Sequence, residues 1–229
     1  MTKNKPHNLL TVKNLSVSAH GKSILEKISF DLEENTLTVL AGANASGKTS
    51  LIQALFGVPP FDIAEGDIFF QSTNITKLSS SEKAKLGIFL AWQKIPTIDS
   101  LKTIDFLEYL DANNISSEKM GRDRIIKTGI QLGLNQKILE RSFGVGFSGG
   151  ELKRLELLQL FILKPRLAIL DEIEAGLDVQ SVAKFAKLII KLKETTTLLV
   201  ISHQLLWQKS LKPEQVLILK DGMLHHSHL

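Results

Sequence analysis

Hydrophobic and polar positions alternate along the first third of the chain with two different periods. Leu10–Val17 and Ile24–Leu32 alternate residue by residue, which predicts two antiparallel strands with one buried face each. Thr36–Ala41 is a short apolar run of the kind that forms a buried strand. The next segment, Lys48–Phe56, has helical spacing, and Gly57 stands where a C-cap is expected.

The middle of the chain has a mostly helical pattern. Two more strands are predicted over Asp67–Phe70 and Gly87–Ala91. Helical spacing then appears in Ser100–Asp111, Glu118–Leu132 and Gln136–Ser142, and a last helix, Gly149–Leu163, ends before Pro165, which cannot continue a helix. We therefore predict an inserted helical subdomain, residues 94–164, within a core made of residues 1–93 and 165–229.

Buried-strand runs return in the last third, at Leu167–Leu170 and Leu198–Ile201, on either side of a predicted helix over Val179–Lys193. Strands that alternate with helices in this way favour a parallel sheet with crossover helices. Asp221-Gly222 predicts a hairpin turn near the C-terminus. The expected fold class is α/β, with a mixed sheet core, an antiparallel β-subdomain and the helical insertion.

Composition narrows the class of protein. The chain has 229 residues, of which 43% are hydrophobic, so it can build a sizeable α/β core and is not expected to be disordered. The net charge is +4, from 28 Lys and Arg against 24 Asp and Glu. Because these basic residues form no arm or stripe, a mixed-charge solvated surface is favoured over nucleic-acid binding.

The sequence has no cysteine, which excludes disulfides and thiolate metal sites within this chain. Met1–Asn8 is polar, and no apolar run has the length of a signal peptide or a membrane span. We expect a cytoplasmic protein that would need a partner for any role in a membrane. His225, His226 and His228 are interpreted as part of a disordered polar tail in preference to a metal site.

The segment Gly42–Thr49 matches the P-loop pattern, follows a predicted strand and opens a predicted helix. In such loops successive backbone N–H groups face a phosphate, at the positive end of the helix dipole. Lys48 is expected to reach the β- and γ-phosphates of a nucleotide, and Thr49 to bind Mg²⁺. The predicted phosphate-binding residues are Gly42, Ala43, Asn44, Ala45, Ser46, Gly47, Lys48, Thr49 and Ser50.

Asp171 and Glu172 follow the apolar run that begins at Leu167. A side chain at the carboxyl end of a parallel strand lies at the edge where open α/β sheets bind ligands. Asp171 is therefore a candidate for holding Mg²⁺, and Glu172 for orienting and deprotonating an attacking water. The alternative is a solvated acidic loop after a strand.

Two polar residues, Gln93 and His203, each follow a predicted core strand. Gln93 is a candidate ligand of Mg²⁺ and of the water, and His203 a candidate catalytic hydrogen-bond partner of the γ-phosphate. Each alone would also be explained as an ordinary polar residue at a strand end. The presence of the P-loop and the acidic pair favours the functional interpretation.

Ser148 and Glu151 have the spacing of a capping box at the start of the helix predicted over Gly149–Leu163. A box needs no ligand, but Gly149 and Gly150 are poor helix formers for a first turn. They fit a site where another molecule approaches the backbone closely, and the N–H groups of a helix start bind anions. We predict a second phosphate site here, formed by Ser148, Gly149 and Gly150, which another copy of the chain would use.

The ordered set of motifs resembles the ABC ATPase family. It consists of Gly42–Thr49, Gln93, Phe147–Glu151, Leu167–Glu172, Ala175–Asp178 and His203, and it covers nearly the whole chain. Within that family Gly144–Glu151 and Asp171–Asp178 look most like SufC-type ATPases of Fe–S cluster assembly. Ala43 departs from the usual Pro, and Ala19 or His20 stands where many members have an aromatic residue.

The resemblance implies a cassette that binds two ATP molecules with Mg²⁺ in a head-to-tail dimer, with Asp178 near the nucleotide. It also implies SufB/SufD-like scaffold partners. The runner-up interpretation is the nucleotide-binding subunit of a membrane transporter, with permease partners. A third is a nucleotide-gated binding module with little turnover, which the presence of Glu172 and His203 disfavours.

Overall fold

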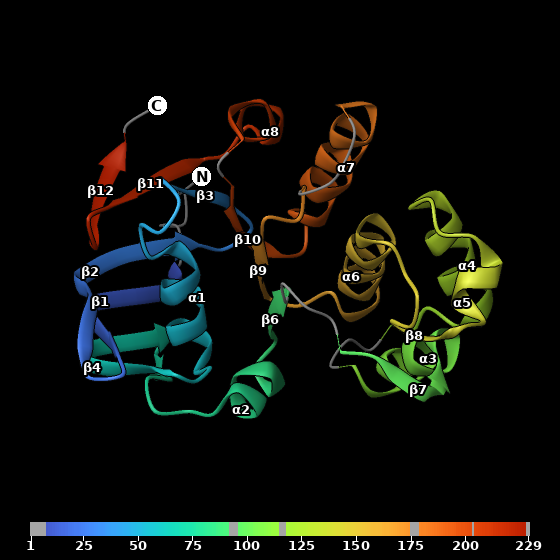
Figure 1. Cartoon of the computed structure of the whole chain (residues 1–229), viewed down its shortest axis with the longest axis horizontal. Coiled ribbons are helices and arrows are strands. Elements are labelled where there is room, and N and C mark those ends of the chain that lie inside the picture. The colour runs from blue at the N-terminus through green and yellow to red at the C-terminus, as the bar shows by residue number, and fades with distance from the viewer. Residues whose placement is uncertain (1–7, 92–95, 115–117, 175–178, 203, 228–229) are drawn as a thin grey trace, which may run out of the picture.

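A six-stranded sheet forms the centre of the molecule, in a computed structural model that describes residues 8–91, 96–114, 118–174, 179–202 and 204–227 (Figure 1). The strand order is β12-β11-β3-β10-β9-β6. Five strands run parallel and β12 is antiparallel to β11, which confirms the predicted mixed sheet. The strands are β3 (Leu37–Ala41), β6 (Ile88–Ala91), β9 (Leu167–Asp171), β10 (Thr197–Ile201), β11 (Gln215–Lys220) and β12 (Met223–Ser227).

A four-stranded antiparallel sheet, in the order β2-β1-β4-β5, covers one side of the core. The two strands predicted first along the chain pair with each other here. The strand predicted over Asp67–Phe70 joins them and begins earlier, at Phe61. The strands of this sheet are β1 (Asn8–Ala19), β2 (Lys22–Glu33), β4 (Phe61–Phe70) and β5 (Thr73–Asn74). The helix α1 (Lys48–Phe56) packs with this sheet, and its observed bounds and Gly57 cap confirm the prediction.

The central strands are buried on both faces and contribute to two hydrophobic clusters. In β10, Leu199 and Ile201 pack toward α1 and the antiparallel sheet, whereas Leu198 and Val200 pack toward the helices on the other face. This division follows from the period of two in a strand. The helices on the second face are α6 (Gly149–Leu163), α7 (Val179–Leu192) and α8 (Leu205–Leu211).

Three helices extend the molecule beyond α6, at the right of Figure 1: α3 (Thr103–Asn113), α4 (Arg122–Gln131) and α5 (Gln136–Leu139). Two predicted boundaries here were wrong: the helix expected from Ser100 begins at Thr103, and the helix expected to reach Ser142 ends at Leu139. The reason is that β7 (Ile98–Lys102) pairs with β8 (Ser142–Phe143). This ribbon delays the start of α3 and takes the residues after α5 out of a helix. The predicted division into a core and an insertion at residues 94–164 remains a prediction.

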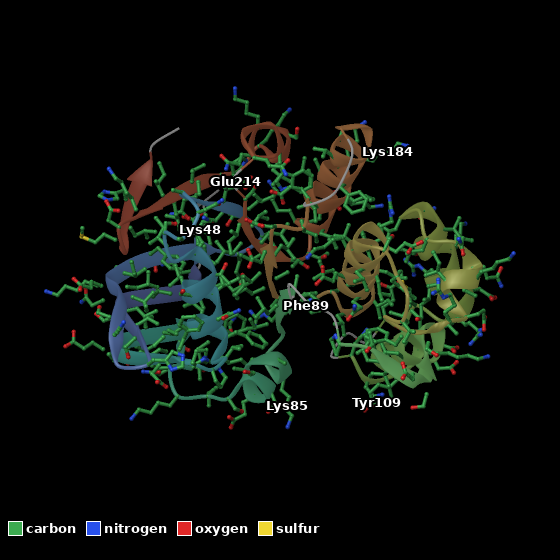
Figure 2. All side chains as sticks on the ribbon, in the orientation of Figure 1. Lys48, Lys85, Phe89, Tyr109, Lys184 and Glu214 are labelled. Atoms are coloured by element: carbon green, nitrogen blue, oxygen red, sulfur yellow. The ribbon has the colours of Figure 1, made fainter. Side chains whose placement is uncertain are left out.

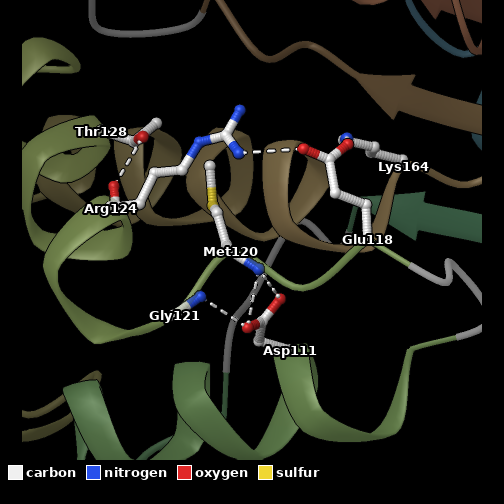
Figure 3. A network of polar contacts seen from close by, with 7 residues as sticks. All are labelled: Asp111, Glu118, Met120, Gly121, Arg124, Thr128 and Lys164. Atoms are coloured by element: carbon white, nitrogen blue, oxygen red, sulfur yellow. Dashed lines mark hydrogen bonds and ion pairs between the residues drawn. The ribbon is translucent and has the colours of Figure 1, made fainter.

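The start of α4 also differs from the sequence prediction, because a buried carboxylate accepts hydrogen bonds from the residues just before the helix. Asp111 accepts hydrogen bonds from the N–H of Met120, at 2.8 and 2.9 Å, and of Gly121, at 2.9 Å (Figure 3). These amides are thereby satisfied outside a helix. The helix predicted from Glu118 consequently begins at Arg122.

Two further helices were not predicted: α2 (Ser80–Lys85) and α8. The expectation of a disordered tail was wrong for His225 and His226, which lie in β12 and pair with Ile218 and Leu217 of β11. His228 lies outside the described residues. Within the described ranges, no helix is both long and apolar enough to cross a membrane.

Candidate active site

The P-loop joins β3 to α1 and is folded tightly against the C-terminal hairpin of the sheet. Gly42 has φ of 155°, and a Cβ at this position would lie 2.4 Å from the carbonyl oxygen of Leu219 and 2.7 Å from Ser46 Oγ. Only glycine fits this contact without displacing backbone. The N–H of Ser46 donates to the carbonyl of Ala43 at 3.2 Å, which closes the turn. The predicted strand–loop–helix context is therefore present.

Lys48 lies where this loop enters α1, and the residue is only 6% exposed. Its Nζ donates to the carbonyl oxygens of Gly42, at 2.9 Å, and Ala43, at 2.8 Å. Figure 2 shows Lys48 near the centre of the molecule, between the two sheets. The ammonium group is thus held beside the backbone that is expected to face phosphate, and it offers a positive charge there.

Asp171 ends β9 and lies next to the first turn of α1. Its side chain is 2% exposed, and Thr49 Oγ1 donates to its Oδ2 over 3.4 Å. The structure therefore brings together the hydroxyl and the carboxylate that the sequence nominates for Mg²⁺. Hydroxyl and carboxylate oxygens are ligands that Mg²⁺ accepts, so this pair fits the ion.

Glu172 follows in a left-handed backbone conformation, with φ of 47°. Its N–H donates to the carbonyl of Ile201 at the end of β10, over 3.1 Å. A non-glycine residue with positive φ is uncommon, and such conformations occur often at functional sites. The backbone bond to β10 holds Glu172 at the same sheet edge as Asp171.

The second candidate site is the start of α6, where the capping box is present as predicted. Glu151 accepts hydrogen bonds from the Ser148 N–H at 2.7 Å and the Ser148 hydroxyl at 2.9 Å, and these bonds hold the pKa of its carboxyl below the usual range. Ser148 and Gly149 are exposed, and no atom lies within 4 Å of a Cβ built on Gly149. The first turn of α6 is therefore accessible to another molecule.

The two sites lie apart within one copy of the chain. Figure 1 shows α1 and α6 on opposite sides of β9. The P-loop and the start of α6 belong to different ends of the fold, the first to the sheet and the second to the helical side. Within a single copy the start of α6 therefore does not complete the P-loop site.

A family model described as "ABC transporter" matches residues 25–175. The chain belongs to the ABC transporter family. A probable ABC transporter ATP-binding protein of Streptococcus pyogenes serotype M18 is 32% identical over 95% of this chain and 87% of its own length. The probable ATP-dependent transporter ycf16 of Cyanidium caldarium is 33% identical over 96% of this chain and 90% of its own length.

Solved ABC cassettes share the fold. The ATP-binding subunit of an ABC transporter superimposes with a TM-score of 0.81 at 21% identity, over 95% of this chain and 90% of that one. A dimeric, post-hydrolysis ATP-binding cassette bound to ADP and Pi gives 0.79 at 18% identity, over 96% and 99% of the two chains. The expected ABC-type P-loop fold is thereby confirmed.

Gln93, Asp178 and His203 lie outside the described residues, so their predicted roles in this ABC cassette stay predictions. Glu174 was assigned no role from the sequence, although it is buried together with Ser202. The Ser202 hydroxyl donates to the Glu174 carboxylate and accepts the N–H of Gln204 at 3.0 Å. The sequence features that could have indicated this pair are a carboxylate two residues after Glu172 and a hydroxyl directly after the apolar strand that ends at Ile201. This contact ties the segment after Asp171 to the end of β10.

Proposed function

We propose that this ABC cassette binds ATP with Mg²⁺ and hydrolyses it to ADP and phosphate. The observation that carries the proposal is the clustering of Lys48, Thr49 and Asp171 at one edge of the central sheet, with the Thr49 hydroxyl 3.4 Å from the Asp171 carboxylate. A buried ammonium, a hydroxyl and a carboxylate are the groups that hold a metal–triphosphate.

In the proposed reaction the chain works mainly by positioning charge. Lys48 leaves the carbonyls of Gly42 and Ala43 to contact the β- and γ-phosphates. Thr49, Gln93 and Asp171 would hold the ion, which would neutralise charge on the phosphate oxygens. Glu172 orients the attacking water and accepts its proton, while Gln93 and His203 contact the water and the γ-phosphate. The backbone N–H groups of residues 42–50 cradle the phosphates.

We further propose that two copies associate head to tail, so that each P-loop faces the start of α6 in the other copy. The exposure of Ser148 and Gly149 supports this arrangement. The N–H groups of Gly149 and Gly150, with the Ser148 hydroxyl, would then stabilise the γ-phosphate from the second side, and Asp178 would lie near the same nucleotide.

A Glu172→Gln variant tests both proposals together. It should still bind ATP, because the P-loop is intact, and it should lose hydrolysis and accumulate dimers. Phosphate release and analytical ultracentrifugation with and without ATP provide the two measurements. Undiminished phosphate release would remove Glu172 from the mechanism, and a variant that stays monomeric at saturating ATP would contradict the head-to-tail dimer.

For the partner we propose a SufB/SufD-like scaffold of Fe–S cluster assembly in the cytoplasm. The support is the resemblance of Gly144–Glu151 and Asp171–Asp178 to SufC-type ATPases. An apolar groove of about 440 Å³ between β6 and the helical side is a candidate docking surface. Its walls include Phe89, Leu90, Ile98, Phe106 and Phe143, and Figure 2 shows Phe89 where the sheet meets the helical side. No cluster chemistry through thiolates belongs to this chain, because it lacks cysteine.

The second candidate function is the nucleotide-binding subunit of a membrane transporter. The names of the relatives from Streptococcus pyogenes and Cyanidium caldarium favour it, since both are called probable transporter components. Affinity purification from the native cell, with and without a charged substitution in the groove such as Phe106→Asp, separates the two. Recovery of a soluble scaffold that is lost in the variant supports the first function, and recovery of a polytopic membrane protein supports the second.

A further inference from the structure

Arg141 connects the helical side of the molecule to the loop that precedes α6. Its guanidinium Nη2 donates to the carbonyl oxygens of Val145, at 2.9 Å, and Gly146, at 3.1 Å. The same guanidinium lies over the ring of Phe147, 5.5 Å from the ring centroid. Three successive residues immediately before Ser148 therefore contact one side chain.

The backbone of Arg141 is itself fixed by a buried residue. Its carbonyl oxygen accepts the N–H of Thr103 at 2.8 Å and the Thr103 hydroxyl at 3.0 Å, and Thr103 is fully buried at the start of α3. Arg141 is thus anchored to α3 through its main chain and to the loop through its side chain. Such an arrangement transmits the position of α3 to the start of α6.

The loop is shaped to accept this side chain. Gly146 has φ of 65°, and a Cβ on Gly146 would lie only 2.4 Å from Arg141 Nη2. Glycine adopts the left-handed backbone without strain, and the lack of a Cβ lets the guanidinium approach as closely as it does here.

We propose that Arg141 is a positioning residue that holds Ser148, Gly149 and Gly150 in the orientation needed to receive the nucleotide of a second copy. This inference rests on the proposed head-to-tail dimer. The planar, multidentate guanidinium can bond two carbonyls and stack on a ring at the same time, which a lysine ammonium on a flexible stem cannot reproduce. Its charge also helps to lower the pKa of the Glu151 carboxyl in the capping box.

The test compares dimerisation with nucleotide binding in the Glu172→Gln background. Adding Arg141→Gln should raise the ATP concentration for half-maximal dimerisation about tenfold or more, as expected for loss of charge-assisted hydrogen bonds. The affinity of the monomer for a fluorescent ATP analogue, measured at protein concentrations too low for dimerisation, should not change. Arg141→Lys should be impaired nearly as much as Arg141→Gln.

Arg166→Gln is the matched control. Arg166 likewise stacks on a ring, 5.3 Å from the centroid of Phe70, and donates to Gln71 at 3.0 Å and Glu34 at 3.1 Å, but it precedes β9 on the core. This control should dimerise like its parent. Full rescue by Arg141→Lys, an unchanged dimerisation curve for Arg141→Gln, or an equal defect in the control would each overturn the role of Arg141.

Hydrogen exchange of the monomer tests the role of Arg141 without requiring a dimer. In Arg141→Gln the amides of residues 147–150 should exchange several-fold faster than in the parent, because the loop loses its tether. Unchanged exchange would overturn the inference even if no dimer forms. If the Glu172→Gln parent fails to dimerise but exchange is faster in Arg141→Gln, the proposed dimer is contradicted. The result would still show that Arg141 holds the loop before α6.

Discussion

Two helix starts in this molecule use the same local device in different surroundings. At α2, Ser79 Oγ accepts the N–H of Glu82, and the Glu82 carboxylate accepts the Ser79 N–H at 2.8 Å. At α6, Ser148 and Glu151 form the same reciprocal pair, with a corresponding distance of 2.7 Å. The two boxes match in residue types, spacing and geometry.

The difference lies in the two residues inside each box. They are Ser80 and Ser81 at α2, but Gly149 and Gly150 at α6. Because α2 begins well without glycines, the capping box alone does not explain why α6 has two of the weakest helix formers in its first turn. In the proposed dimer the glycines are the part of the α6 start that meets the nucleotide, and the box is the support that allows the helix to tolerate them.

Grafting the α2 residues onto α6 should have the largest effect. In a Gly149→Ser, Gly150→Ser variant the box is kept, and stability should rise by about 0.5 kcal/mol or more, because serine is the better helix former. ATP binding by the P-loop should be unchanged. Hydrolysis should fall by about a hundredfold, since side chains would stand between the N–H groups and the phosphate. Phosphate release and thermal unfolding measure the two effects.

The reverse change is the control. Ser81→Gly at α2 should cost about 0.5 kcal/mol of stability and leave phosphate release per folded molecule unchanged. If the grafted α6 hydrolyses ATP at the parental rate, the glycines are only structural, and the distinction between the two helix starts disappears.

Removing the cap serines should have a smaller effect, and one that separates the two sites. Ser79→Ala and Ser148→Ala should each cost about 1 kcal/mol, the usual value for loss of an N-cap. Only Ser148→Ala should also weaken ATP-driven dimerisation in the Glu172→Gln background, by several-fold, because its hydroxyl is proposed to contact nucleotide. Equal dimerisation by both variants would mean that Ser148 acts only as a cap.

The same pair of helices shows how far sequence reasoning reaches. The bounds of α6 were predicted because Ser148 and Glu151 have the spacing of a capping box at its start and Pro165 follows its end. The helix α2 was missed because its principal buried residue is Lys83, a charged side chain that periodicity counts as polar. Lys83 is fully buried and donates to the carbonyl of Leu55 at the end of α1 over 2.9 Å, and burial lowers its pKa to about 8.

The residues of the candidate site likewise fall into those that the sequence predicted and those that it did not. Lys48, Thr49 and Asp171 were predicted because each belongs to a motif whose spacing has a chemical reason, and the structure brings them together. Arg141 was not predicted because it binds backbone carbonyls, and carbonyls carry no sequence signal. Glu174 and Ser202 were missed because their contact joins the ends of two strands that are distant in sequence.

The smallest expected effect concerns the two box carboxylates. Hydrogen bonds from Ser79 lower the pKa of the Glu82 carboxyl, and hydrogen bonds from Ser148 lower that of Glu151. A carboxyl whose pKa is lower in the folded state contributes stability above its unfolded value of 4.5, and this contribution is lost as the pH falls through the folded pKa. Glu82 is exposed and Glu151 is partly exposed, so solvent screens the effect.

Glu82→Gln and Glu151→Gln should therefore each lower the melting temperature slightly at pH 7, and the difference from the parent should shrink as the pH falls below 4.5 and through the folded pKa. Glutamine keeps an oxygen that accepts the cap N–H, so only the charge is removed. Salt should shrink both effects at pH 7. The positive charges of Arg141 and Arg154 both act on Glu151, whereas among the described residues the charge of Lys85 acts on Glu82. The Glu151 variant should accordingly be the more salt-sensitive of the two. The opposite order in thermal unfolding at low and high salt would show that Arg141 does not act on this carboxylate.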